Sequence, residues 1–119
     1  MSPEKPQYVS DLVVYLLHEL GVEYAMLNPG ATTRGLHESL VTYGGNKAPE
    51  VITCCHEEIA VAMAEGYYLA TGRPQATLVH NIVGLQHASK AIYEAWLNNV
   101  PMLILGGTGP LDASHRRPW

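Results

Sequence analysis

Hydrophobic positions along the chain follow two alternating patterns, one with the spacing of helices and one made of short apolar runs. Apolar residues that recur every three or four positions predict helices at 11–20, 33–43, 57–71 and 85–98. Runs rich in Val, Ile and Leu predict buried strands at 22–27, 51–55, 76–80 and 102–105. Because strands and helices alternate with short connections, the sequence predicts an α/β fold: an open, mostly parallel sheet with helices on both faces.

Local signals predict where these helices begin and end. Ser10 is a good N-cap for the first helix and Gly21 a good stop, and Gly72 followed by Pro74 is typical of the end of the third helix. Gly84 is expected to open a loop before the fourth helix. The small residues of the third helix predict a buried stripe made of Ala60, Met63, Ala64 and Tyr67.

Composition narrows the class of protein. The 119 residues are 47% hydrophobic and 15% charged, which fits one globular domain with a single core. The net charge of −4 argues against a nucleic-acid partner, and Arg116 with Arg117 forms no basic stripe. No apolar run approaches the ~18 residues of a membrane span, and the N-terminus lacks the layout of a signal peptide, so a cytoplasmic protein is expected.

The two cysteines, Cys54 and Cys55, are adjacent, so their side chains should point to opposite faces of a strand. A disulfide between them is not expected, and reduced thiols fit a cytosolic setting. With His56 they suggest a metal site, but no second ligand pair follows at zinc spacing, so no metal site is predicted.

The most reactive residues follow the predicted strands. Parallel sheets bind ligands at the carboxyl ends of their strands. Glu57 and Glu58 begin a helix, where the dipole favours negative charge; each could act chemically or simply stabilise the helix. Gly106 and Gly107 lead into no P-loop sequence and are interpreted as a flexible exit from the last strand. The four strand ends are Asn28-Pro29-Gly30, Cys55-His56-Glu57, His80-Asn81 and Gly106-Gly107.

From His56 to Pro74 the sequence reads His-Glu-x-x-Ala-x-x-Met-Ala-x-Gly-Tyr-Tyr-x-x-Thr-Gly-x-Pro. This stretch resembles the pyrimidine-binding domain of thiamine-diphosphate (ThDP) enzymes such as acetolactate synthase, benzoylformate decarboxylase and pyruvate decarboxylase. Tyr68 stands where that family usually has Ala. The resemblance implies a flavodoxin-like three-layer fold and a role for Glu57 at N1′ of the cofactor's aminopyrimidine. There the carboxyl group favours the imino tautomer, which removes the thiazolium proton. Glu58 is expected to face solvent or to be structural.

The segment from His80 to His87 is similar to the decarboxylase pattern His-Ser-x-x-Gly-x-x-Asn, with Gly84 retained and His87 in place of Asn. The resemblance implies a catalytic His80, which could exchange protons with intermediates; a structural histidine is the open alternative. It also implies cofactor-binding roles for Gly84, His87 and the turn Asn28-Pro29-Gly30.

The resemblance is incomplete beside that turn, because Ala31 replaces a Ser that contacts substrate carboxylate in the decarboxylase. The substitution puts an aryl 2-oxo acid in doubt as the substrate. Possible anion contacts are Thr32, Thr33 and Arg34. His56 and Gln86 could line the same edge, while ordinary surface positions are expected for His18, His37 and His115.

The family binds the cofactor's diphosphate through Mg²⁺ in a second domain that carries a Gly-Asp-Gly motif, and these 119 residues lack that motif. The chain, 1–119, is therefore expected to be one pyrimidine-binding domain, either a split subunit or a fragment of a longer enzyme. The implied partners are a diphosphate-binding domain or subunit, a second copy in a homo-oligomer, and a small 2-oxo acid. The alternative hypothesis is a non-catalytic, flavodoxin-like binding module that keeps the motif for packing.

Overall fold

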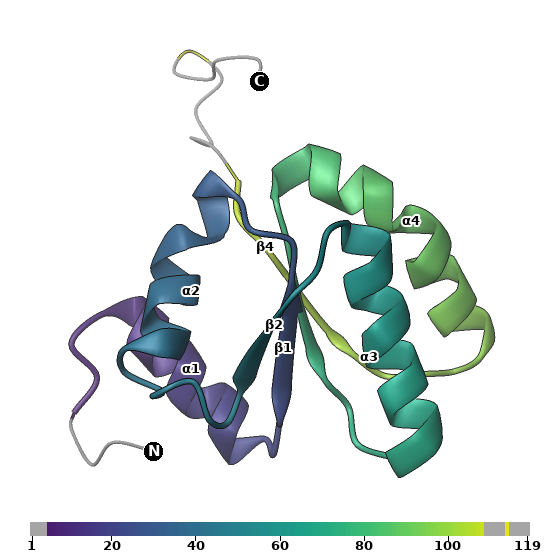
Figure 1. Ribbon diagram of the computed structural model, residues 1–119. Helices are drawn as coiled ribbons and strands as arrows, with labels where there is room; N and C mark the ends of the chain where they lie inside the picture. The colour runs from purple at the N-terminus through teal and green to yellow at the C-terminus, as the bar shows by residue number, and fades with distance from the viewer. Residues whose placement is uncertain (1–4, 109–113, 115–119) are drawn as a thin grey trace.

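The computed structural model describes residues 5–108 and Ser114, and it has three layers with a parallel sheet in the middle (Figure 1). The sheet order is β2-β1-β3-β4, and all three pairings are parallel. The predicted α/β class is therefore confirmed. The strands are β1 (Tyr24–Leu27), β2 (Glu50–Thr53), β3 (Ala76–Val79) and β4 (Leu103–Gly106).

Two helices cover each face of the sheet (Figure 1). The helices are α1 (Val9–Glu19) and α2 (Arg34–Val41) on one face, with the short 3-10 turn η1 (Ala31–Thr33) before α2, and α3 (Glu57–Thr71) and α4 (Asn81–Leu97) on the other. Alternation along β1 explains this arrangement: Ala25 and Leu27 join the core under α1 and α2, whereas Met26 joins the core under α3. Full burial of a Leu or Met side chain contributes about 1.5–3 kcal/mol, so both layers are needed.

The register of the sheet brings the strand ends to one level. Leu27 at the end of β1 is paired with Thr53 of β2, and also with Leu78 of β3. Val79 is paired in turn with Gly106 of β4. The residues that follow each strand therefore emerge at the same edge, which is the upper edge in Figure 1.

The start of α1 differs from the prediction. Ser10 is not the N-cap, because the helix begins at Val9 and Tyr8 holds the cap position. The capping acceptor is Asp11, whose Oδ2 accepts hydrogen bonds from the backbone N–H groups of Gln7 (3.1 Å) and Tyr8 (3.0 Å). Within the helix, Ser10 instead accepts a hydrogen bond from the Ser39 hydroxyl.

The start of α4 also differs, because the helix begins at Asn81 and no loop follows Gly84. Asn81 has φ 52°, a left-handed conformation that Asn adopts more readily than most residues, and this turns the chain abruptly from β3 into the helix. The N–H of Gly84 donates to the carbonyl of His80 at 2.7 Å as the first helical bond. Gly84 therefore serves close packing in the first turn.

The buried stripe of α3 is rotated from the predicted one. Ala60 and Ala64 are buried as expected, but Met63 is 39% exposed and Tyr67 only half-buried, whereas Val61 is fully buried. The reason is α4, which packs beside α3 and covers the side that carries Val61. The stripe therefore serves two neighbours, the sheet and a helix.

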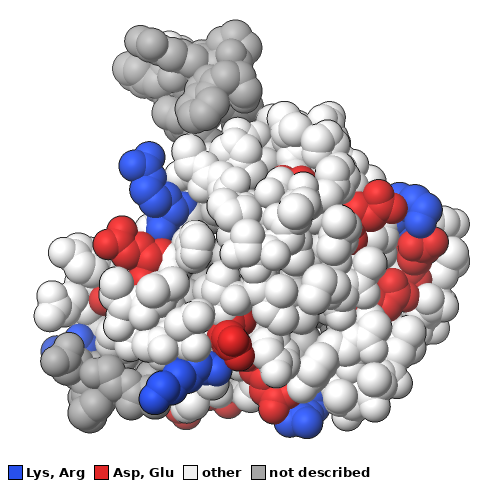
Figure 2. Space-filling view, in the orientation of Figure 1, with Lys and Arg blue, Asp and Glu red and all other residues white. Residues whose placement is uncertain are grey.

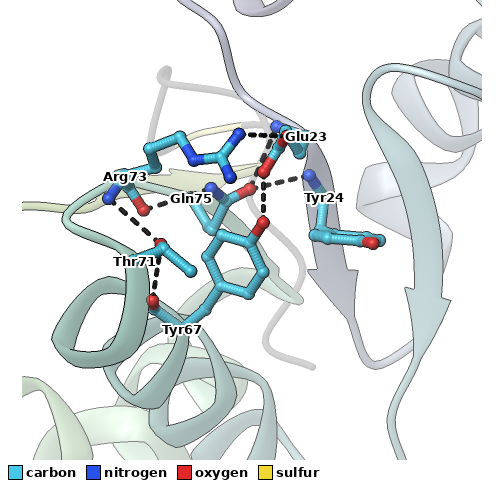
Figure 3. A network of polar contacts seen from close by, with 6 residues as sticks. All are labelled: Glu23, Tyr24, Tyr67, Thr71, Arg73 and Gln75. Carbon is cyan, nitrogen blue, oxygen red and sulfur yellow. Dashed lines mark hydrogen bonds and ion pairs between the residues drawn. The ribbon is translucent and has the colours of Figure 1, made fainter.

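A polar network closes the opposite edge of the sheet, where β1 and β3 begin (Figure 3). The fully buried Gln75 accepts hydrogen bonds from the backbone N–H groups of Glu23 (3.0 Å) and Tyr24 (2.7 Å), and it donates to the carbonyl of Arg73 at 3.1 Å. The Glu23 carboxylate also accepts from Arg73 and from the Tyr67 hydroxyl. This network joins the start of β1 to the end of α3 and the start of β3.

Other predictions concern single residues. Cys54 is buried and Cys55 exposed, both as free thiols, which fits opposite faces of the chain. His18 and His37 are half-buried, and Nδ1 of His18 lies 3.1 Å from the carbonyl oxygen of Ala48. His115, Arg116, Arg117 and the segment Gly109-Pro110 lie outside the described residues. Within the described part of the chain, no helix is long and apolar enough to cross a membrane.

Candidate functional site

Glu57 lies at the centre of the edge formed by the strand ends. It is the first residue of α3, and its side chain is buried, with 3% exposure. Its Oε2 atom is buried and has no hydrogen-bond partner among the described residues; the nearest ionisable partner, Nδ1 of His87, is 3.5 Å away. Since 3.5 Å is too long for a strong hydrogen bond, this oxygen has capacity for a ligand.

The local environment keeps the Glu57 carboxyl group ionised. Burial alone raises its pKa, but the backbone N–H at the helix start and the side chains of Asn28 and His87 outweigh burial and lower the pKa below its usual range. His56 supports this helix start, because its Nδ1 accepts a hydrogen bond from the Glu58 N–H at 3.2 Å. At neutral pH, Glu57 is therefore a buried carboxylate that can accept a proton or a hydrogen bond.

Gly84 explains how α4 can lie so close to Glu57. A Cβ atom on Gly84 would be 2.9 Å from Oε1 of Glu57 and 3.2 Å from the carbonyl carbon of Val79. No side chain larger than hydrogen fits there without movement. The absence of a side chain on Gly84 leaves room for the Glu57 carboxylate and allows the start of α4 to pack against the start of α3.

His80 forms a second part of the site, together with the turn that follows β1. Its Nδ1 lies 2.9 Å from the hydroxyl oxygen of Thr32 and is therefore engaged in a hydrogen bond. The other ring nitrogen, Nε2, is the one that could exchange a proton with a ligand. A Cβ on Gly30 would lie 2.5 Å from Cγ of His80, and a Cβ on Gly107 would lie 2.5 Å from Cβ of Thr32. The ends of β1, β3 and β4 therefore meet around this imidazole.

The remaining predicted residues lie beside Glu57, make structural contacts, or are exposed. His87 stacks on His56 with ring centroids 4.7 Å apart, so both lie beside Glu57. Thr33 is buried, and its hydroxyl donates to the Gly30 carbonyl at 3.0 Å, which is a structural role. Glu58 is half-buried, and its carboxylate lies 3.5 Å from Nζ of Lys90, also a structural contact. Exposed positions in the predicted set include Pro29, Ala31, Arg34, Gln86 and His87.

Two features of the site escaped the sequence analysis. Thr32 was considered only as an anion contact, whereas it is the hydrogen-bond partner of His80. Gly107 was interpreted as part of a flexible exit, whereas it lies against Thr32. The only available signal was the pair Gly106-Gly107 at the end of a buried strand, because glycine there permits a close backbone approach.

A hollow of about 480 Å³ lies elsewhere, between the N-terminal segment, α1 and α2. Its lining includes Asp11 and Ser39 but none of the predicted site residues. The Asp11 carboxylate already accepts two backbone hydrogen bonds there, so its chemistry is that of a helix cap. We therefore place the candidate site at Glu57.

Comparisons with known proteins identify the family of the chain. Residues 7–118 match the family described as thiamine pyrophosphate enzyme, N-terminal TPP binding domain. The chain is 36% identical over 98 residues to the acetolactate synthase large subunit of Haemophilus influenzae, covering 82% of this chain and 17% of that protein. It is 31% identical over 119 residues to a probable 2-ketoarginine decarboxylase of Pseudomonas aeruginosa, covering all of this chain and 20% of that protein.

A solved structure shows the same fold. It belongs to a putative thiamin diphosphate-dependent enzyme from Mycobacterium smegmatis, with a TM-score of 0.78 and 27% sequence identity over 92% of this chain and 20% of that chain. The chain thus spans about one fifth of the length of these relatives. With a family match over nearly its whole length and a buried carboxylate at the expected strand end, the chain belongs to the thiamine pyrophosphate enzymes, as an N-terminal TPP binding domain.

Proposed function

We propose that this domain is the pyrimidine-binding part of a ThDP-dependent 2-oxo acid decarboxylase or carboligase of the acetolactate synthase type. The observation that carries the proposal is Glu57: a buried, ionised carboxylate with one oxygen that lacks a hydrogen-bond partner among the described residues. A buried polar atom without a partner costs about 1–3 kcal/mol, so its presence favours a ligand that supplies the missing donor. The protonated N1′ of an aminopyrimidine is such a donor.

When bound, the cofactor supplies the carbon nucleophile that attacks the carbonyl of a 2-oxo acid. The chain's own contribution is to hold a proton between Glu57 and N1′. Asn28 and the backbone at the start of α3 stabilise the carboxylate form, so Glu57 returns readily to the charged state after it has carried the proton. Gly84 and His87 border the carboxylate, and Pro29 and Gly30 belong to the turn after β1, where Gly30 lies against His80; we propose that these residues shape the pyrimidine site.

His80 is proposed to handle protons at the substrate. Thr32 holds one nitrogen of its imidazole, and this hydrogen bond fixes the ring orientation and leaves the other nitrogen to donate or accept. The ring is half-buried and packs over Gly30, on the same edge as Glu57. Because both side chains lie at this edge, we propose that Glu57 acts on the cofactor and His80 on the 2-oxo acid.

The proposed partners are a diphosphate-binding domain or subunit, which would hold Mg²⁺, and a second copy of the chain. Exposed apolar side chains at the first turns of α4 support a covered surface at this edge: Ile82 is 66% exposed, Val83 46% and Leu85 49%. Figure 2 shows few charged side chains over the upper middle of the face it displays. A cytoplasmic location is proposed from the free thiols of Cys54 and Cys55.

The test is Glu57→Gln in the enzyme that contains this domain, with Glu58→Gln as the matched control. Glutamine keeps the size and one acceptor but cannot take up the relay proton. We therefore expect hydrogen exchange at the thiazolium carbon, followed by NMR, to fall by roughly 10²–10⁴-fold in Glu57→Gln and to change little in Glu58→Gln. Equal exchange rates in Glu57→Gln and the parent would favour the alternative, a binding module that keeps the motif for packing.

A further inference from the structure

Three potential metal ligands gather at the start of α3 although they come from two separate segments. His56 and Glu57 stand at the beginning of the helix, and His87 comes from the second turn of α4. One ligand atom from each residue lies within 4.8 Å of the other two. The imidazole rings of His56 and His87 are stacked, with an interplanar angle of 18°, so the two side chains lie against each other.

The chemistry of this group is specific. Two imidazole nitrogens and one carboxylate oxygen are the donors preferred by Zn²⁺ and its neighbours Ni²⁺ and Cu²⁺, whereas Mg²⁺ and Ca²⁺ prefer oxygen ligands. Oε2 of Glu57 is available to a cation, because this buried oxygen has no hydrogen-bond partner among the described residues. His87 is the adjustable ligand, since its side chain is 49% exposed.

Ligand atoms around a tetrahedral zinc ion are about 3.4 Å apart, given bond lengths of about 2.1 Å, so the three side chains must close in slightly. The half-exposed imidazole of His87 can make most of this movement, because it already lies 3.5 Å from Oε2 of Glu57. Nδ1 of His56 already accepts the 3.2 Å hydrogen bond from the Glu58 N–H, so binding through Nδ1 would break that bond and binding through Nε2 would keep it. Water would fill the fourth position on the open side.

We propose that His56, Glu57 and His87 form a binding site for a zinc-class divalent transition metal. This departs from the expectation that no metal site is present, which considered only Cys54, Cys55 and His56. Metal on Oε2 of Glu57 would prevent that oxygen from contacting an aminopyrimidine. Metal binding does not depend on the proposed function. The expectation that bound metal slows thiazolium exchange does rest on the proposed role of Glu57.

The direct test is calorimetric titration of the protein with Zn²⁺ in the absence of cofactor. We expect one Zn²⁺ per chain and no competing binding of Mg²⁺. His87→Ala and His56→Ala should each weaken binding at least about tenfold, the lower limit even for residues in the outer shell of a metal site. The matched controls are His37→Ala, a half-buried histidine on α2, and Cys55→Ser, the exposed thiol beside His56. Both should bind Zn²⁺ like the parent.

Cobalt provides a second measurement, because Co²⁺ in a tetrahedral nitrogen and oxygen site has intense visible absorption bands that His87→Ala should abolish. The proposal is overturned if the folded parent does not bind Zn²⁺, if His87→Ala binds as tightly as the parent, or if Cys55→Ser abolishes binding. Circular dichroism checks that each variant is folded; His87→Ala is the decisive one because its exposed ring adds little to the core. If Zn²⁺ binds as expected but thiazolium exchange in the complete enzyme is unaffected, the proposed role of Glu57 is wrong and the metal site stands.

Discussion

Replacing Gly84 with alanine separates what stabilises this domain from what makes it functional. In a helix interior, Ala is more stable than Gly by about 0.5–1 kcal/mol. At Gly84, however, the added Cβ would meet Oε1 of Glu57 at 2.9 Å and the backbone of Val79 at 3.2 Å. Overpacking of this kind costs about 1–3 kcal/mol. The expected net change is therefore a destabilisation of about 0–2.5 kcal/mol, which is a decrease of up to roughly 10 °C in melting temperature.

The same substitution should affect the carboxylate more than the fold. Oε1 of Glu57 is at the end of a flexible side chain, so the clash is relieved by moving the carboxylate away from its position. A displacement of about 1 Å at a reacting group can cost about 10²-fold in rate, so thiazolium exchange in the complete enzyme should fall by that order while the domain stays folded.

Gly66→Ala is the matched control, because Gly66 lies within α3 and a Cβ there would have, apart from its chain neighbours and the backbone of its own helix, no described atom within 4 Å. It should raise the free energy of unfolding by about 0.5–1 kcal/mol in urea denaturation and leave exchange unchanged. The reasoning would be refuted if Gly84→Ala stabilised the domain as much as Gly66→Ala does. It would also be refuted if Glu57→Ala failed to relieve part of the destabilisation in the double variant.

Three further substitutions test other parts of the structure. Gln75→Leu leaves the half-buried backbone N–H groups of Glu23 and Tyr24 without their acceptor, so the free energy of unfolding in urea should fall by about 2–4 kcal/mol, and a loss below 1 kcal/mol would contradict the network. The Ser39 hydroxyl, assisted by backbone N–H groups and opposed by burial, lowers the pKa of Asp11 below its usual 3.8. The Asp11 carboxylate therefore stabilises the fold above about pH 5, and this stabilisation is lost as the pH falls through the lowered pKa. In unfolding measured as a function of pH, Asp11→Asn should reduce the loss of stability at acidic pH. His80→Ala should preserve thiazolium exchange but slow product formation about 10²-fold; a parallel loss of both would make His80 a support for the cofactor or fold.

The fold was predictable because the hydrophobic pattern and most of the local turn signals predicted the same helices and strands. Central parallel strands are covered on both faces, so they appear as short apolar runs such as the fully buried β3. The errors came where one residue type serves two purposes. Ser10 and Asp11 are both good capping residues, and the sequence alone could not decide between them. Gly84 can open a loop or permit close packing, and only the position of Glu57 shows that packing is its role.

The contents of the site were predictable only in part. Glu57 could be found because the start of a helix favours a carboxylate, and because the surrounding motif is specific. His87 was named from a family position, but its stacking on His56 and its place 3.5 Å from Glu57 depend on how α4 packs against α3. In that packing, Val61 of α3 lies in one core cluster with Ala88 and Ala91 of α4, and no local pattern gives the resulting distance between Glu57 and His87.

The state of Glu57 shows why the motif alone does not determine the chemistry. Burial alone would favour the neutral acid, and a neutral acid could not accept a proton. The charge is kept by the backbone of α3 and by Asn28 and His87, which come from the turn after β1 and from α4. A chain with the same helix but without these two side chains would have a carboxyl group of higher pKa at the same position. The function of this edge therefore depends on the register that brings three segments together as much as on the sequence from His56 to Pro74.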